Sequence, residues 1–153
     1  MFGSKKLDLQ TAERKLKQVL CTSPYFAGCR FEILEDRKFV SFQTSEGIGM
    51  SNRLVNHLCG VPGTYEGFVS MTAYRDGELS LKYGYSRKMS SVGYIMASMY
   101  EQKLDRSRFK HIFLIGNDGD YTEFRLFVDD VTESNIESKA KFLIESAESV
   151  LFC

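Results

Sequence analysis

Residues 66–85, EGFVSMTAYRDGELSLKYGY, decide the fold. On both sides of the Asp76-Gly77 pair, apolar and aromatic residues alternate with small or polar ones. Such alternation is typical of β-strands, and an Asp-Gly pair accepts the positive φ angles of a type I′ turn. The stretch therefore predicts an antiparallel hairpin with strands at 66–74 and 79–85.

Further hairpins are expected on either side of this one. Residues 29–34 alternate apolar with polar side chains, and 38–43 reads as the returning strand. Residues 109–116 contain the apolar run Ile-Phe-Leu-Ile, typical of a strand buried on both faces, and 121–128 returns after a turn. Strands that arrive as hairpins predict a mostly antiparallel sheet of about six strands.

Helical patterns flank these hairpins. Asp8 can cap a helix that runs to about residue 21, and Ser90 or Ser91 can cap one that runs to about residue 104. Thr132 can cap the last helix. Apolar residues recur every three or four positions in each pattern, so these helices are amphipathic and need an apolar surface to cover.

Residues 44–64 give no firm pattern. A short helix from Ser51 to Gly60 and a partly ordered loop both fit this segment. The whole sequence predicts one α+β domain over residues 1–153, with the antiparallel sheet packed by two or three amphipathic helices.

The composition limits the class of protein. Twenty Lys and Arg balance twenty Asp and Glu, which argues against a general nucleic-acid binder. No apolar run reaches the length of a signal peptide or a membrane helix, so we expect a cytoplasmic chain without membrane contact. Cysteines lie at irregular positions without a C-x-x-C pair, which indicates reduced thiols: Cys21, Cys29, Cys59 and Cys153.

Residues that could carry catalysis are few. The histidines are His57 and His111, and no Gly-x-Ser-x-Gly elbow presents a serine. Cys59 lies two residues after His57, so on a short helix the two side chains point in different directions. We therefore expect no catalytic site, no metal and no cofactor. The alternative is a small-ligand site or an enzyme whose polar groups meet only in three dimensions.

Aromatic residues on the predicted strands favour binding of a protein partner, because tyrosine offers a large contact area with few rotors to freeze. The candidates for this contact are Tyr74, Tyr83, Tyr85 and Phe127. A basic connection at 103–111 gives a second alternative, a phosphate contact through Arg106, Arg108 and Lys110. Because the total charge is neutral, binding to nucleic acid is the weaker hypothesis.

The stretch FRLFVDDVTESNI at 124–136 is similar to the last strand, acidic turn and capped final helix of the YbjN-like and type III secretion chaperone-like superfamily. The resemblance implies a non-enzymatic, chaperone-like or regulatory domain, often dimeric, which holds an extended segment of a client protein. It places the dimer interface at Ile95, Met99, Ile112 and Leu114. The neutral charge and the extra strand before the middle helix favour the wider superfamily over a dedicated secretion chaperone.

Overall fold

A computed structural model describes residues 6–24, 26, 30–44, 48–49, 66–85, 91–116 and 121–151. The strands are β1 (Phe31–Glu35), β2 (Phe39–Thr44), β3 (Ile48–Gly49), β4 (Glu66–Tyr74), β5 (Leu79–Tyr85), β6 (His111–Ile115) and β7 (Thr122–Val128). They form one antiparallel sheet in the order β1-β2-β4-β5-β7-β6, with the short β3 paired to the start of β4. The three predicted hairpins are confirmed, as is the α+β class.

The hairpin of β4 and β5 has the predicted bounds but a different turn. Gly77 has a φ of 97°, whereas Asp76 does not have the positive φ that a type I′ turn requires. The Gly77 amide donates to the Tyr74 carbonyl, and the Tyr74 amide donates to the Glu78 carbonyl. The turn is therefore longer than the predicted one, and only its glycine adopts the left-handed conformation.

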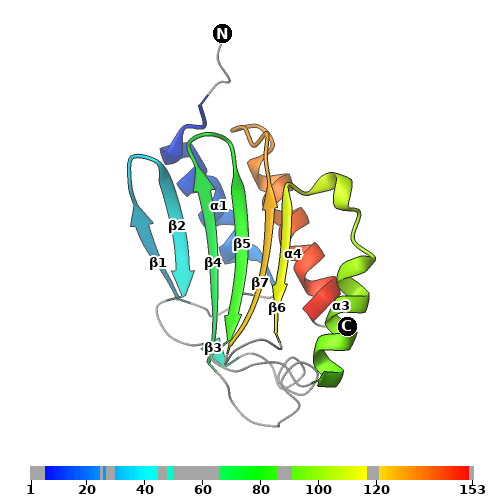
Figure 1. Cartoon of the computed structure of the whole chain (residues 1–153). Coiled ribbons are helices and arrows are strands. Elements are labelled where there is room, and N and C mark those ends of the chain that lie inside the picture. Colours follow the sequence, from blue (N-terminus) through cyan, green and yellow to red (C-terminus); the bar gives the residue numbers. More distant parts are fainter. Residues whose placement is uncertain are drawn as a thin grey trace.

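Helices cover one face of the sheet. They are α1 (Leu9–Thr22), α3 (Ser91–Gln102) and α4 (Ile136–Leu151). Figure 1 looks onto the opposite face of the sheet, so α1 and α4 lie behind the strands and α3 lies at the margin beyond β6. Of the described helices, none is both long and apolar enough to cross a bilayer.

The core lies between the sheet and the helices. Alternate strand residues point into it, including Val40, Phe42, Met71, Leu81, Phe124 and Leu126. The predicted apolar stripe of α4 supplies the facing layer, and all of its members are buried: Ile136, Ala140, Leu143, Ile144, Ala147, Val150 and Leu151. The helical pattern of that segment therefore predicted the buried face correctly.

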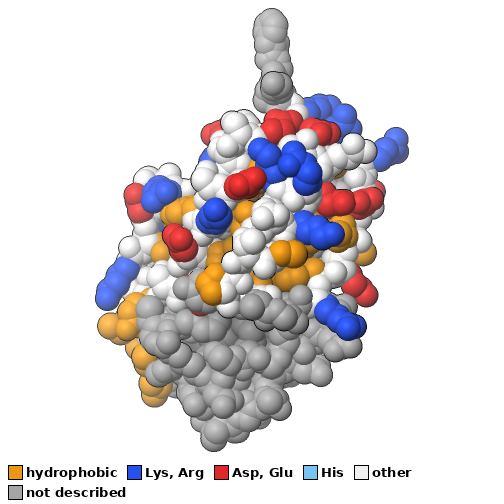
Figure 2. All heavy atoms as spheres, turned by 180° about the vertical axis from the view of Figure 1, so that it is seen from behind, with side chains coloured by type: hydrophobic (Ala, Val, Ile, Leu, Met, Phe, Trp, Pro, Cys, Tyr) orange, Lys and Arg blue, Asp and Glu red, His pale blue; other side chains and the backbone are white. Residues whose placement is uncertain are grey.

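The orientation of α3 differs from the expectation. Its large apolar residues face solvent, with Val92 67%, Ile95 58% and Met99 56% exposed, and its buried residues are Gly93 and Ala97. Helix α3 packs against α4, and small residues let two helices approach closely. Figure 2 shows hydrophobic side chains at the margin formed by α3, whereas charged side chains of both signs are interspersed elsewhere.

Two further expectations need correction. Strand β6 ends the sheet and is not buried on both faces, because Phe113 on its uncovered face is 47% exposed. Helix α4 begins at Ile136 rather than directly after Thr132. A turn at 133–135 intervenes, in which the Asn135 side chain accepts a hydrogen bond from the Thr132 amide.

The start of α1 is joined to the turn that precedes α4. Asp8 caps α1 as predicted, accepting hydrogen bonds from the amide and the hydroxyl of Thr11. The backbone amide of Asp8 donates to the Glu133 carboxylate, and Lys15 donates to the Glu133 carbonyl. The start of α1 is thereby fixed beside the start of α4.

Candidate functional site

The sheet face without helices, which we call the open face, is a regular grid of side chains. Strand register aligns one row across the sheet, the hydroxyl row: Leu34, Ser41, Thr72, Ser80, Phe127 and His111. The next row, the cation row, is Glu32, Gln43, Ser70, Lys82, Arg125 and Phe113. The hydroxyl row carries small hydroxyl residues at its centre and larger residues toward both edges. The cation row is polar or charged from Glu32 to Arg125 and ends at Phe113 on β6.

This size pattern produces a hollow of about 220 Å³ at the centre of the open face. Its lining is Leu34, Phe39, Ser41, Gln43, Ser70, Thr72, Tyr74, Ser80, Lys82 and Arg125. Hydroxyl-bearing residues form the floor because their side chains are too short to fill the space between the bulky neighbours. The Ser41 and Thr72 hydroxyls lie 2.8 Å apart across β2 and β4, which fixes part of the floor by a hydrogen bond.

Aromatic side chains flank the hollow on two sides. On the β2–β4 side, the rings of Phe39 and Tyr74 have centroids 6.1 Å apart. On the β6–β7 side, Phe113 and His111 each meet the Phe127 ring nearly edge-on, at 6.1 and 5.9 Å. Such pairs gain a favourable ring geometry beyond the burial of area. The open face thus presents apolar surface at both ends of a polar floor.

Positive charges are adjacent on this floor. Lys82 and Arg125 are direct partners in the register of β5 and β7. Arg125 is 3.3 Å from the Glu123 carboxylate, and its guanidinium lies 5.6 Å from the Phe127 ring centre. Among the described residues, no ion pair involves Lys82. Like charges directly opposite each other destabilise a sheet, and here the Glu123 carboxylate offsets the charge of Arg125 but is not ion-paired with Lys82.

A second hollow, of about 480 Å³, adjoins the open face where the hairpin turns gather. Its lining is Lys6, Arg37, Lys38, Tyr74, Arg75 and Asp76, and Tyr74 also belongs to the first hollow. The backbone holds these turns together, because Arg75 donates its amide to the Lys38 carbonyl and Leu7 donates to the Arg75 carbonyl. Basic side chains from separate segments therefore meet at one end of the open face.

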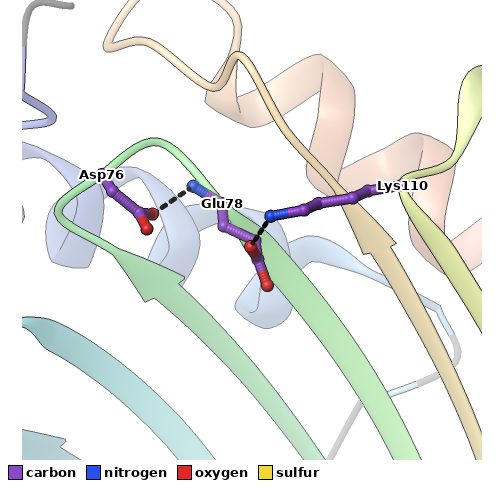
Figure 3. A network of polar contacts seen from close by, with 3 residues as sticks. All are labelled: Asp76, Glu78 and Lys110. Carbon is purple, nitrogen blue, oxygen red and sulfur yellow. Dashed lines mark hydrogen bonds and ion pairs between the residues drawn. The ribbon is translucent and has the colours of Figure 1, made fainter.

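The basic connection singled out from the sequence has partners within the chain. Arg106 forms an ion pair with Glu101, and the Arg108 guanidinium lies 3.9 Å from the centre of the Phe142 ring. Lys110 is 2.6 Å from the Glu78 carboxylate (Figure 3). The hydrogen bond to Glu78 raises the pKa of Lys110. These residues do not converge on a shared site for a phosphate group.

The predicted partner-binding residues are divided between the two faces. Tyr74 and Phe127 lie on the open face, as described above. The prediction for Tyr83 is wrong, because its side chain is 1% exposed and belongs to the core. The Tyr85 backbone pairs with β4 and β7, and its side chain lies outside the described residues.

The predicted dimer residues do not form one surface. Ile95 and Met99 are exposed on α3. Ile112 and Leu114 are half-buried and pack against the core. The apolar run containing them predicted burial, but the alternation along β6 sends them to the side opposite Phe113.

Candidate catalytic and metal-binding residues remain apart in the part of the chain that the structure covers. Over these residues, no group of three His, Cys, Asp or Glu is placed to hold a metal ion. Cys21 is exposed with a free thiol, and His111 belongs to the aromatic group on the open face. His57 and Cys59 lie outside the described residues, as does most of the 44–64 segment.

The sequence did not lead us to expect a buried carboxyl group. Glu148 of α4 is only 7% exposed. A glutamate with its ordinary pKa is charged at neutral pH. Burial raises its pKa to about 7, and a hydrogen bond from Tyr83 offsets part of this rise. Position 148 follows Ile144 by one helical turn, so the apolar periodicity of α4 already contained the signal.

The central hollow of the open face was not predicted from the sequence either. Its sequence signal is a set of small hydroxyl residues in the opposite phase to the buried strand residues, such as Ser70 and Thr72 beside Val69 and Met71. Alternation alone assigns these residues to the polar face. Only the strand order shows that several strands place them side by side.

Comparison with known proteins adds no family to these observations. A scan of protein-family models and searches of curated proteins and solved structures gave no match to this chain. The resemblance at residues 124–136 therefore stays a prediction.

Proposed function

We propose that this chain is a non-catalytic, chaperone-like or regulatory protein-binding domain that holds an extended segment of a partner protein on its open face. The observation that carries the proposal is the central hollow flanked by aromatic groups on both sides. Exposed aromatic rings supply contact area at low entropic cost, and polar groups between them provide orientation.

An extended segment matches the dimensions of this surface. Alternate side chains of an extended chain lie about 7 Å apart on one side, and neighbouring strands of a sheet are about 4.8 Å apart. Apolar side chains of such a segment can contact Tyr74 at one end and Phe113 at the other, while a polar one enters the hollow.

The charge of the open face supports a protein partner over nucleic acid. Carboxylates of Glu32, Glu78 and Glu123 are interspersed with the cations on this side of the sheet. Tight binding of a phosphate chain requires a continuous excess of positive charge. The neutral net charge of the chain also favours a protein segment as the partner.

We further propose that the domain works in the cytoplasm as a homodimer, with α3 at the dimer contact. Val92, Ile95 and Met99 recur at helical spacing and form an exposed apolar stripe on α3. A second copy of the same stripe is the simplest cover for it, since a two-fold contact is self-complementary.

Site-specific photocrosslinking tests the binding face. A photoreactive phenylalanine at position 113 is compared in cells with the same residue at Gln18, which is exposed on α1. We expect one discrete protein adduct from position 113, crosslinked through a segment whose synthetic peptide binds the purified chain. Equal adducts from both positions, or a peptide that does not bind, contradict the proposal.

A further inference from the structure

We propose that the partner segment is acidic, and that one of its Asp or Glu carboxylates binds between Lys82 and Arg125 in the central hollow. This inference rests on the proposed function and specifies the chemistry of the partner. It starts from the direct cross-strand pairing of two cations on the floor of a hollow.

Lys82 and Arg125 carry like charges opposite each other on β5 and β7. Two like charges opposite each other in a sheet weaken it, and the Glu123 carboxylate lies against Arg125 at 3.3 Å. Among the described residues, no carboxylate is paired with Lys82. A carboxylate entering the hollow from outside relieves the repulsion and gives Lys82 an ion-pair partner.

Hydrogen-bond donors lie beside Lys82 in the central hollow. Ser70 is the direct cross-strand partner of Lys82, and Ser80 lies two residues before it on the same face of β5. The hydroxyls of these serines and the amide of Gln43, which also lines the hollow, are donors. A carboxylate has lone pairs for about four such donors, so it matches the floor of the hollow better than a neutral group does.

Basic residues also line the hollow at the turn end of the sheet. The hollow at the turn end is lined by Lys6, Arg37, Lys38 and Arg75 together with Asp76, and it shares Tyr74 with the central hollow. Further acidic residues of the segment therefore extend toward that end. Within the cation row, however, Glu32 stands at the other edge. Because carboxylates of this chain lie among its cations, a partner segment with separate acidic side chains matches this face better than the continuous charge of a nucleic acid.

A peptide-display selection on the whole chain tests the inference. Random 12-residue peptides are selected on the immobilised protein, and winning peptides are synthesised with Glu or Gln at each acidic position. We expect an Asp or Glu flanked by apolar residues, and an affinity loss of about tenfold on either Glu→Gln in the peptide or Lys82→Met in the protein. The two losses should be less than additive, because Lys82→Met removes one of the two contacts that Glu→Gln removes.

The variants separate binding from folding. Lys82→Met keeps the aliphatic stem on the sheet and removes one of two repelling charges, so its melting temperature should equal or exceed that of the wild type. Lys141→Gln is the matched control, since Lys141 is exposed on α4, and it should leave peptide affinity unchanged.

The outcomes distinguish this inference from the proposed function. Peptides that lose affinity on Phe113→Ala but show no acidic preference and ignore Lys82→Met overturn the inference and leave the proposed function in place. If no selected peptide responds to Phe113→Ala, the proposed function fails as well. Binding of a dT12 oligonucleotide with a steep salt dependence, lost in Lys82→Met, replaces the acidic peptide by nucleic acid.

Discussion

Glu148 makes the stability of this protein depend on pH in a direction that can be calculated. Its pKa is 4.5 for the unperturbed group and about 7 in the folded chain. The folded state therefore binds the Glu148 proton more tightly than the unfolded state does. For a raised carboxyl pKa, the native state is penalised once the group ionises, so stability is lost as the pH rises from about 4.5 to about 7.

The size of this penalty follows from the same shift. Each pKa unit corresponds to about 1.4 kcal/mol, so the full penalty above pH 7 is about 3 kcal/mol. Replacing Glu148 with Gln removes the ionisable proton and keeps the shape of the side chain. The variant should match the wild type at pH 4.5 and should exceed it by up to about 3 kcal/mol at pH 8.

Urea unfolding of both proteins at several pH values measures this difference. Glu145→Gln is the control for the substitution itself, because Glu145 is exposed on the same helix. Tyr83→Phe provides an internal check: it removes the hydrogen bond that lowers the pKa of Glu148, so the loss of stability should extend to higher pH. A Glu148→Gln difference that is flat from pH 4.5 to 8 refutes the reasoning.

Other expected outcomes concern the turn, the core and α3. Gly77→Ala should cost about 1–2 kcal/mol in urea unfolding, because φ is 97° and the added Cβ meets the Val131 carbonyl at 3.3 Å; Gly84→Ala has open space and should change stability by less than about 1 kcal/mol. Leu81→Ala removes a fully buried side chain and should cost about 2–5 kcal/mol by the same assay. Ile95→Glu should convert a dimer to a monomer in sedimentation velocity, and a wild-type chain that sediments as a monomer contradicts the dimer proposal.

The local elements could be predicted from the sequence because local signals determine them. The bounds of β4 and β5 follow from alternation around Asp76-Gly77, and the start of α1 follows from the cap at Asp8. The type of the turn between β4 and β5 could not be predicted from the sequence, because a glycine at the left-handed position fits more than one hairpin loop. Local pattern therefore gives element type and approximate bounds, and the details of the connections depend on the whole hairpin.

The candidate site could not be predicted because it depends on neighbours that are distant in sequence. Lys82 and Arg125 become partners only when β5 pairs with β7 rather than with β6. Similarly, the apolar stripe of α3 indicated a buried face, but the buried residues of α3 are Gly93 and Ala97, and the helix packs against α4. Hydrophobicity ranks residues by their tendency to be buried, whereas strand order and helix contacts decide which residues meet.

The packing of α1 against α4 has a consequence for synthesis of the chain on the ribosome. The hairpins of the sheet can form as soon as they emerge, because their pairings are local. The apolar side of those hairpins, however, is sealed by a helix that is translated after every strand. Until residues 136–151 leave the exit tunnel, the nascent sheet exposes apolar surface to chaperones and to neighbouring chains.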